Sequence, residues 1–228
     1  LLAQYEQPAR VLALTGAAFD FPAALPANIR YVGPQLDDPE WAGRDRVFWS
    51  KGHVAPLIYT IMSEVGYFDN DLLCTLRKLG SPLQGHPSAD RCRGLEVSSG
   101  SLGQGLSVAV GTALGLRLKG SEARVYAIMG DGEQQEGQIW EAAMFAAGKK
   151  VDNLISTVDY NGRQIDGDVD DVMPLGDLKA KWVAFGWDVL ETNGNDMAQL
   201  VNALGQAKTR TGKGKPVMIL MRTEMGQG

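Results

Sequence analysis

The chain has 228 residues, of which 44% are hydrophobic and 21% are charged, a composition typical of a globular domain with a substantial core. Its net charge of −5, without a basic cluster, argues against a nucleic-acid partner. No apolar run approaches the roughly 20 residues that span a membrane, and no signal peptide is visible, so we expect no membrane contact and a cytoplasmic location. The cysteines, Cys74 and Cys92, form neither a disulfide framework nor a metal motif and are expected to be free thiols.

The first 42 residues differ from the remainder of the chain. Residues 11–15 could form a strand, but prolines at positions 22, 26, 34 and 39 interrupt any regular element that follows. We therefore expect residues 1–42 to form an atypical N-terminal segment and residues 43–228 to form one domain.

Helices are expected in the first part of that domain, where apolar side chains recur at helical spacing. Asp69 or Asn70 is expected to cap the second helix, and residues 98–101 the third. Glycines inside the third helix weaken it, so Gly111 and Gly115 indicate that another helix packs closely there. The expected helices are residues 54–64, 69–77 and 102–118, with a loop at 80–94.

From residue 124 onward, stretches typical of strands and helices alternate. Short apolar runs, each followed by a crossover, predict a parallel sheet. The predicted fold class is therefore α/β, a parallel sheet with helices on both faces. We expect strands at residues 124–129, 154–159, 187–192 and 216–222, helices at 138–147, 178–185 and 196–204, and an acidic surface loop at 168–179.

Two turns follow neighbouring strands of this predicted sheet. Gly130-Asp131-Gly132 follows the first strand and Asn161-Gly162 the second, 30 residues later (161 − 131). Ligands of open parallel sheets bind at this edge, and a helix N-terminus just beyond the first turn favours an anion. Carboxylate and amide oxygens suit Mg²⁺ or Ca²⁺ held against phosphate oxygens. The alternative is that both are only tight turns, which the paired strand ends disfavour.

The two turns resemble the thiamine diphosphate signature of transketolase-like enzymes. Further motifs, in the same order along the chain, make the resemblance to transketolase itself specific. From about residue 44 to its C-terminus, the chain is similar to the N-terminal, diphosphate-binding subunit of a split transketolase. The motifs are Ser50-Lys51-Gly52-His53, Leu83-Gln84-Gly85-His86-Pro87, Ser99-Gly100-Ser101-Leu102-Gly103-Gln104-Gly105, Gln135-Glu136-Gly137 and Ile165-Asp166-Gly167.

The resemblance implies roles for individual residues. His53 would lie near the thiazolium and the substrate, and His86 would contact the donor hydroxyl and carbonyl; both would be catalytic, since a neutral imidazole can carry a proton near pH 7. Taken alone, a single histidine is more often structural. The metal ligands would be the side chains of Asp131 and Asn161 and the backbone carbonyl of Arg163. The cofactor contacts would be His53, Gly100, Leu102, Gly130, Asp131, Gly132, Glu133, Asn161 and Ile165.

The implied activity is transfer of a two-carbon ketol unit between sugar phosphates, with thiamine diphosphate and Mg²⁺ (or Ca²⁺) as cofactors. In the family, the glutamate that activates the cofactor lies in a pyrimidine-binding domain, so the expected partner is a C-terminal transketolase subunit, in a dimer or heterotetramer. One alternative is a non-catalytic domain that retains the fold. Another is 1-deoxyxylulose-5-phosphate synthase or a 2-oxo acid dehydrogenase alpha subunit, which share the two turns but lack the histidine motifs.

Overall fold

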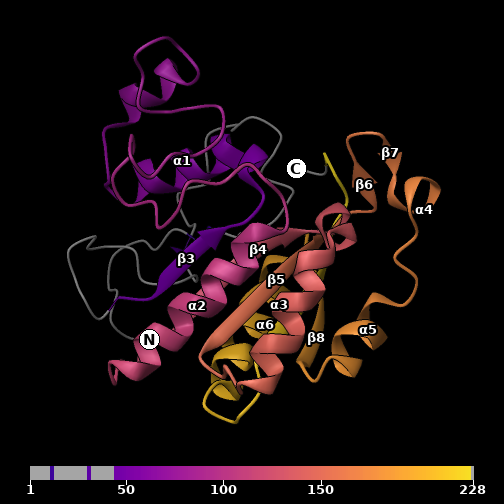
Figure 1. Ribbon diagram of the computed structural model, residues 1–228. Coiled ribbons are helices and arrows are strands. Elements are labelled where there is room, and N and C mark those ends of the chain that lie inside the picture. The colour runs from indigo at the N-terminus through magenta and orange to yellow at the C-terminus, as the bar shows by residue number, and fades with distance from the viewer. Residues whose placement is uncertain (1–10, 13–29, 32–43, 227–228) are drawn as a thin grey trace.

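The computed structural model describes residues 11–12, 30–31 and 44–226 of the chain (Figure 1). Its centre is a five-stranded sheet in which every neighbouring pair of strands is parallel. The parallel sheet predicted from the sequence is confirmed. In spatial order the strands are β3 (Arg46–Trp49), β4 (Val125–Gly130), β5 (Leu154–Tyr160), β9 (Val217–Arg222) and β8 (Asp188–Asn193).

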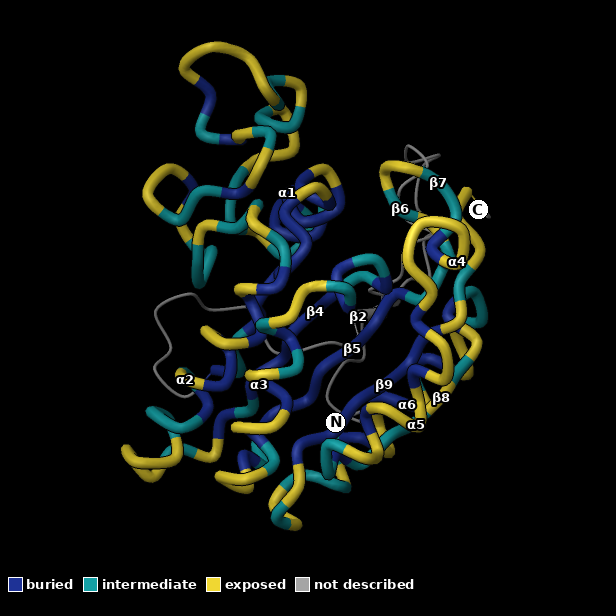
Figure 2. Tube along the Cα trace, turned by 45° about the vertical axis from the view of Figure 1, so that its right-hand side comes forward, coloured by how far each residue is buried: buried dark blue, intermediate teal, exposed yellow. Residues whose placement is uncertain are grey.

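Helices cover both faces of the sheet, as predicted. Along β4, Tyr126 and Ile128 point into one apolar cluster while Val125, Ala127 and Met129 point into the other, because successive side chains of a strand face opposite sides. Both clusters are buried beneath exposed helix surfaces (Figure 2). The first cluster is covered by α1 (Ala55–Glu64) and α6 (Met197–Arg210), and the second by α2 (Gln104–Leu118), α3 (Gly137–Gly148) and α5 (Leu178–Ala184).

The start of α2 differs from the prediction. The helix begins at Gln104, and its N-cap is Gly103, which has a left-handed backbone (φ 85°) and makes no side-chain cap bond to the described residues. The predicted cap at residues 98–101 is therefore wrong. The packing expected at Gly111 and Gly115 is also wrong, because a Cβ added at either would meet no described atom within 4 Å.

Shorter elements complete the described part of the chain. The expected helix at 69–77 is a 3-10 helix, η3 (Asn70–Thr75); Asp69 is its N-cap but makes no side-chain cap bond within the described part. The expected loop at 168–179 contains the short helix α4 (Val169–Val172). Small strand pairs join β1 (Val11–Leu12) to β2 (Arg30–Tyr31) in parallel and β6 (Arg163–Gln164) to β7 (Gly167–Asp168) in antiparallel fashion.

Two of the exclusions drawn from the sequence can be compared with the described residues. Cys74 is exposed and Cys92 is buried, and both are free thiols as expected. Of the helices that the structure describes, none is long and apolar enough to cross a membrane. The remainder of the N-terminal segment, including most of the strand expected at 11–15, lies outside the described residues.

Candidate functional site

The two predicted turns lie side by side at the carboxyl edge of the sheet. Gly130 ends β4 and is paired with β5, so the residues that follow each strand emerge next to one another. The amide of Gly162 donates a hydrogen bond of 2.5 Å to Oδ2 of Asp131, and the amide of Gly132 donates one of 2.8 Å to Oδ1. The structure therefore joins the Asp131 turn directly to the Asn161 turn.

The carboxylate of Asp131 is almost fully buried, with 2% of the residue exposed. Burial raises its pKa, while the amides of Gly162 and Gly132 and the charge of Lys51 act in the opposite direction. Within the described residues, no group of three His, Cys, Asp or Glu side chains is placed to hold a metal. The carboxylate of Asp131 and the amide oxygen of Asn161 are oxygen donors of the kind that suits Mg²⁺ or Ca²⁺.

The amide of Asn161 is held on both sides. Its Nδ2 donates to Oδ2 of Asp159 at 3.4 Å, and its Oδ1 accepts a 2.8 Å hydrogen bond from the backbone amide of Arg163. The guanidinium of Arg163 pairs with Asp168 across the β6–β7 hairpin, so only its main chain is directed toward the turn. Ile165, at the tip of this hairpin, is 97% exposed.

A buried ion pair supports the second turn. Nζ of Lys51 lies 2.5 Å from Oδ2 of Asp159, and the two side chains are 5% and 2% exposed. The other carboxylate oxygen of Asp159 accepts a hydrogen bond from the hydroxyl of Thr223. Since Asp159 also accepts from Asn161, the ion pair fixes the residue that in turn orients the Asn161 amide.

A second buried carboxylate supports the first turn. Oε1 of Glu133 accepts hydrogen bonds from the hydroxyl of Ser50 and from the amide of Gly103 at 2.8 Å, and Oε2 accepts from the amide of Gly130 at 3.1 Å. Burial raises the pKa of Glu133, and these donors oppose the rise. Leu102, partly buried, immediately precedes Gly103 in the turn before α2.

A tight backbone contact joins the segments that carry the two histidines. A Cβ on Gly52 would lie 2.7 Å from the backbone nitrogen of Gly100, and a Cβ on Gly100 would lie 3.2 Å from Cγ of His86. His53 is exposed as a residue, yet desolvation by nearby protein atoms, together with the electrostatic effects of Lys51 and His86, lowers its pKa from the usual 6.5. The structure thus brings the segments of His53, His86 and Gly100 together, and the lowered pKa favours the neutral form of the His53 imidazole near pH 7.

Sequence reasoning missed the buried supports of both turns. Ser50 and Lys51 were recognised only as part of the Ser50-Lys51-Gly52-His53 motif, because the strand before them, β3, is four residues long and gave no periodic signal. Their partners Glu133 and Asp159 lie 83 and 108 residues further along the chain. The detectable signal was a serine and a lysine directly after a short apolar run, which places two polar side chains at the carboxyl edge of a sheet.

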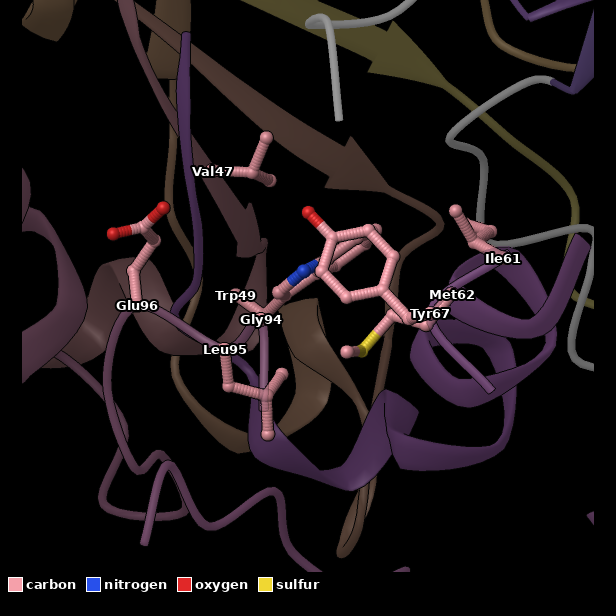
Figure 3. A pocket seen from close by; sticks show the side chains of 8 residues that line it. All are labelled: Val47, Trp49, Ile61, Met62, Tyr67, Gly94, Leu95 and Glu96. Atoms are coloured by element: carbon pink, nitrogen blue, oxygen red, sulfur yellow. The ribbon is translucent and has the colours of Figure 1, made fainter. Parts of the chain in front are cut away.

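A small cavity elsewhere in the molecule is separate from these residues. It lies between β3, α1 and the chain near Gly94, and its volume is about 10 Å³, close to the smallest that holds one water molecule. Figure 3 shows its mainly apolar lining, with the ring of Tyr67 beside Trp49 and Met62. None of the predicted cofactor or metal residues lines it, so this cavity is not the predicted site.

The sheet and its two turns define a thiamine diphosphate-binding α/β fold. A crystal structure of a transketolase mutant from Pichia stipitis matches 85% of this chain and 30% of its own, with a TM-score of 0.78 and 31% identity. Transketolase from Leishmania mexicana matches 82% of this chain and 29% of its own, with a TM-score of 0.75 and 34% identity. The family model described as the thiamine diphosphate binding domain of transketolase matches residues 16–228, and the chain belongs to the transketolase family.

Sequence relatives agree with this family. The chain is 45% identical over 206 residues to the 6-deoxy-6-sulfo-D-fructose transketolase subunit SqwG of Clostridium sp. (strain MSTE9), covering 90% of this chain and 74% of the relative. It is 40% identical over 205 residues to one of the apulose-4-phosphate transketolase subunits of Phocaeicola vulgatus, covering 90% and 71%. Human transketolase is 37% identical over 194 residues, but the chain covers only 30% of its length.

These findings confirm the predicted family, its fold and its thiamine diphosphate-binding, transferase character. The family match begins at residue 16, inside the N-terminal segment that was expected to be atypical. The domain boundary at residue 42 and the individual roles of the site residues stay predictions.

Proposed function

We propose that the chain is the diphosphate-binding subunit of a two-subunit transketolase, located in the cytoplasm and active with a partner that carries the pyrimidine-binding half. The sizes of the relatives support this proposal. The chain covers about three quarters of two proteins that are themselves named transketolase subunits, but under a third of the human enzyme. A dimer or heterotetramer of the two kinds of subunit follows from the same proposal.

The observation that carries the proposed cofactor site is the hydrogen bond from Gly162 to the buried carboxylate of Asp131, which holds the two turns together. In our proposal the side chains of Asp131 and Asn161, with the main-chain carbonyl of Arg163, hold Mg²⁺ (or Ca²⁺) against the cofactor diphosphate. A divalent cation would neutralise the carboxylate charge beside the phosphates. Thiamine diphosphate, when bound, supplies the electron sink for two-carbon transfer.

The remaining residues would position the cofactor and move protons. His53 follows Gly52, which contacts Gly100, and His86 lies beside Gly100 itself; both can exchange protons with substrate hydroxyls, because an imidazole can donate and accept a proton. Ile165 is exposed at the hairpin tip, where its apolar side chain is free to contact a ring of the cofactor. Gly130 and Gly132 allow the main chain to approach the diphosphate.

The proposed substrates are sugars that carry a terminal anion. The two subunit relatives are named for a sulfonated sugar and for a sugar phosphate, which share that feature. The donor would lose a two-carbon ketol unit to the cofactor, and the acceptor would receive it.

Titration with thiamine diphosphate tests the proposed site. Wild-type chain should bind the cofactor in the presence of Mg²⁺ and lose it in EDTA. Asp131→Ala should remove Mg²⁺-dependent binding, because it removes the only carboxylate in the proposed ligand set. Asp170→Ala, which removes an exposed acid of α4, serves as the control and should bind as wild type does. Unchanged affinity in Asp131→Ala would refute the metal assignment.

A further inference from the structure

The side chain of Glu133 is directed into the protein, beneath the predicted cofactor turns. The residue lies in the 3-10 helix η4 (Gly132–Gln135) and is 2% exposed. Its two oxygens accept hydrogen bonds from Ser50, Gly103 and Gly130, two of which are backbone amides. A carboxylate offers about four acceptor positions, so three of them are occupied by the protein itself.

Each of the three donors belongs to a different segment of the proposed site. Ser50 follows β3 and begins the motif that contains His53; Gly103 follows Gly100 in the turn before α2; Gly130 ends β4 just before Asp131. Along the chain, Ser50 and Glu133 are 83 residues apart. One buried carboxylate therefore connects the three parts of the chain that carry the proposed histidine, turn and metal-ligand contacts.

The chemistry of these bonds makes the arrangement specific for a carboxylate. All three partners are donors, and hydrogen bonds to a charged acceptor are shorter and stronger than those between neutral groups. A glutamine in the same place keeps one acceptor oxygen but turns an NH₂ group toward an N–H or O–H donor. At least one of the three segments would then lose its partner inside the protein, which is costly for a buried donor.

We propose that Glu133 is a positioning residue that holds the Ser50, Gly103 and Gly130 segments in the geometry that thiamine diphosphate requires, and that it does not itself contact the cofactor. The inference deepens the proposed function and rests on it for the identity of the ligand. Glu133 would then act on the cofactor site through the three segments that it holds, and not by the direct contact with the cofactor that the family resemblance implied. Supporting groups of this kind typically change ligand affinity by roughly 10- to 100-fold when they are altered.

The test compares Glu133→Gln with wild type in the full chain. Two measurements are made: affinity for thiamine diphosphate with Mg²⁺, and hydrogen exchange of the Gly103 and Gly130 amides, which donate directly to the carboxylate. We expect affinity to fall by about 10-fold or more and both amides to exchange faster, while amides of β5 and β9 keep their protection. Glu141→Gln, an exposed glutamate of α3, is the matched control and should behave as wild type.

Three outcomes would overturn the inference: wild-type affinity in Glu133→Gln, unchanged exchange at Gly103 and Gly130, or an equal loss of protection throughout the sheet. If Glu133→Gln does not fold, Ser50→Ala is the deciding variant, because it removes one donor and leaves the carboxylate in place. We expect the Ser50→Ala protein to unfold cooperatively and to bind the cofactor more weakly than wild type does. Unchanged affinity in this variant would refute the inference. Failure of the wild-type chain to bind the cofactor would count against the proposed function. Hydrogen exchange of the Gly103 and Gly130 amides would still test the positioning role of Glu133.

Discussion

Replacing Lys51 with methionine probes the buried ion pair that supports the Asn161 turn. Nζ of Lys51 lies 2.5 Å from Oδ2 of Asp159, with side chains 5% and 2% exposed. Methionine keeps much of the apolar stem but leaves a buried carboxylate without its cation. Removing one partner of such a pair costs about 3–5 kcal/mol. Because Thr223 and Asn161 still donate to Asp159, we expect the lower value, about 3 kcal/mol.

Urea unfolding followed by tryptophan fluorescence measures this loss. A domain of this size changes its Tm by about 2–4 °C per kcal/mol, so Lys51→Met should also lower the Tm by roughly 6–12 °C in a thermal scan. The exposed pair of Lys179 and Glu191 provides the control: its atoms are 2.7 Å apart, but its side chains are 51% and 34% exposed. Lys179→Met should cost no more than about 1 kcal/mol, because surface ion pairs contribute little.

A double-mutant cycle isolates the interaction itself. Lys51→Met combined with Asp159→Asn should cost clearly less than the two single changes added together, because the second change removes the unpaired charge that the first created. Additive effects, or a loss below about 1 kcal/mol in Lys51→Met, would refute the buried ion pair as a support of this turn.

Three further predictions concern the same edge of the sheet. Gly52→Ala should destabilise the chain by about 1–3 kcal/mol in a urea titration, because the added Cβ would lie 2.7 Å from the backbone nitrogen of Gly100. Gly111→Ala is the control in the same titration: the position is helical and open, so the change should stabilise the chain by about 0.5–1 kcal/mol. Desolvation by nearby protein atoms lowers the pKa of His53, so NMR should find its imidazole neutral at pH 7 and its pKa below the usual 6.5. Because the unfolded chain binds the proton more tightly, this residue should reduce stability as the pH falls below 6.5; a measured pKa above 6.5 would contradict this. Ile165→Asn should keep the free energy of unfolding within about 0.5 kcal/mol, since the side chain is 97% exposed, yet weaken thiamine diphosphate binding; an unchanged dissociation constant would remove it from the site.

The sheet could be predicted where local signals were strong. The strands β4 and β9 are almost continuous apolar runs, and β5 is a mixed run of apolar and β-branched residues; all three are buried between two helical layers. Runs of this kind show in the sequence without knowledge of the fold. By contrast, β3 is a short edge strand, and its identity depends on pairing with β4, nearly 80 residues away (125 − 46 = 79). The start of α2 was misjudged because Gly103 ends the preceding turn in a left-handed conformation, where the serines were the expected caps.

The site was predictable to the extent that it rests on turns. The carboxyl ends of adjacent parallel strands meet, so Asp131 and Asn161 come together once β4 and β5, which follow one another along the chain, are taken as neighbours. The bonds that hold these turns could not be predicted, because Ser50 and Lys51 reach partners 83 and 108 residues away. Such contacts depend on the sheet order, with β3 beside β4 and β4 beside β5. Sequence spacing alone carries no information about that order.

Ketol transfer by reconstituted subunits tests the central proposal most directly. The purified chain would be assayed with thiamine diphosphate, Mg²⁺ and a ketose phosphate donor such as xylulose 5-phosphate, first alone and then with a candidate pyrimidine-binding subunit. We predict no turnover by the chain alone and cofactor-dependent turnover when the partner is added, with Asp131→Ala inactive in both. Full turnover by the isolated chain would contradict the proposal.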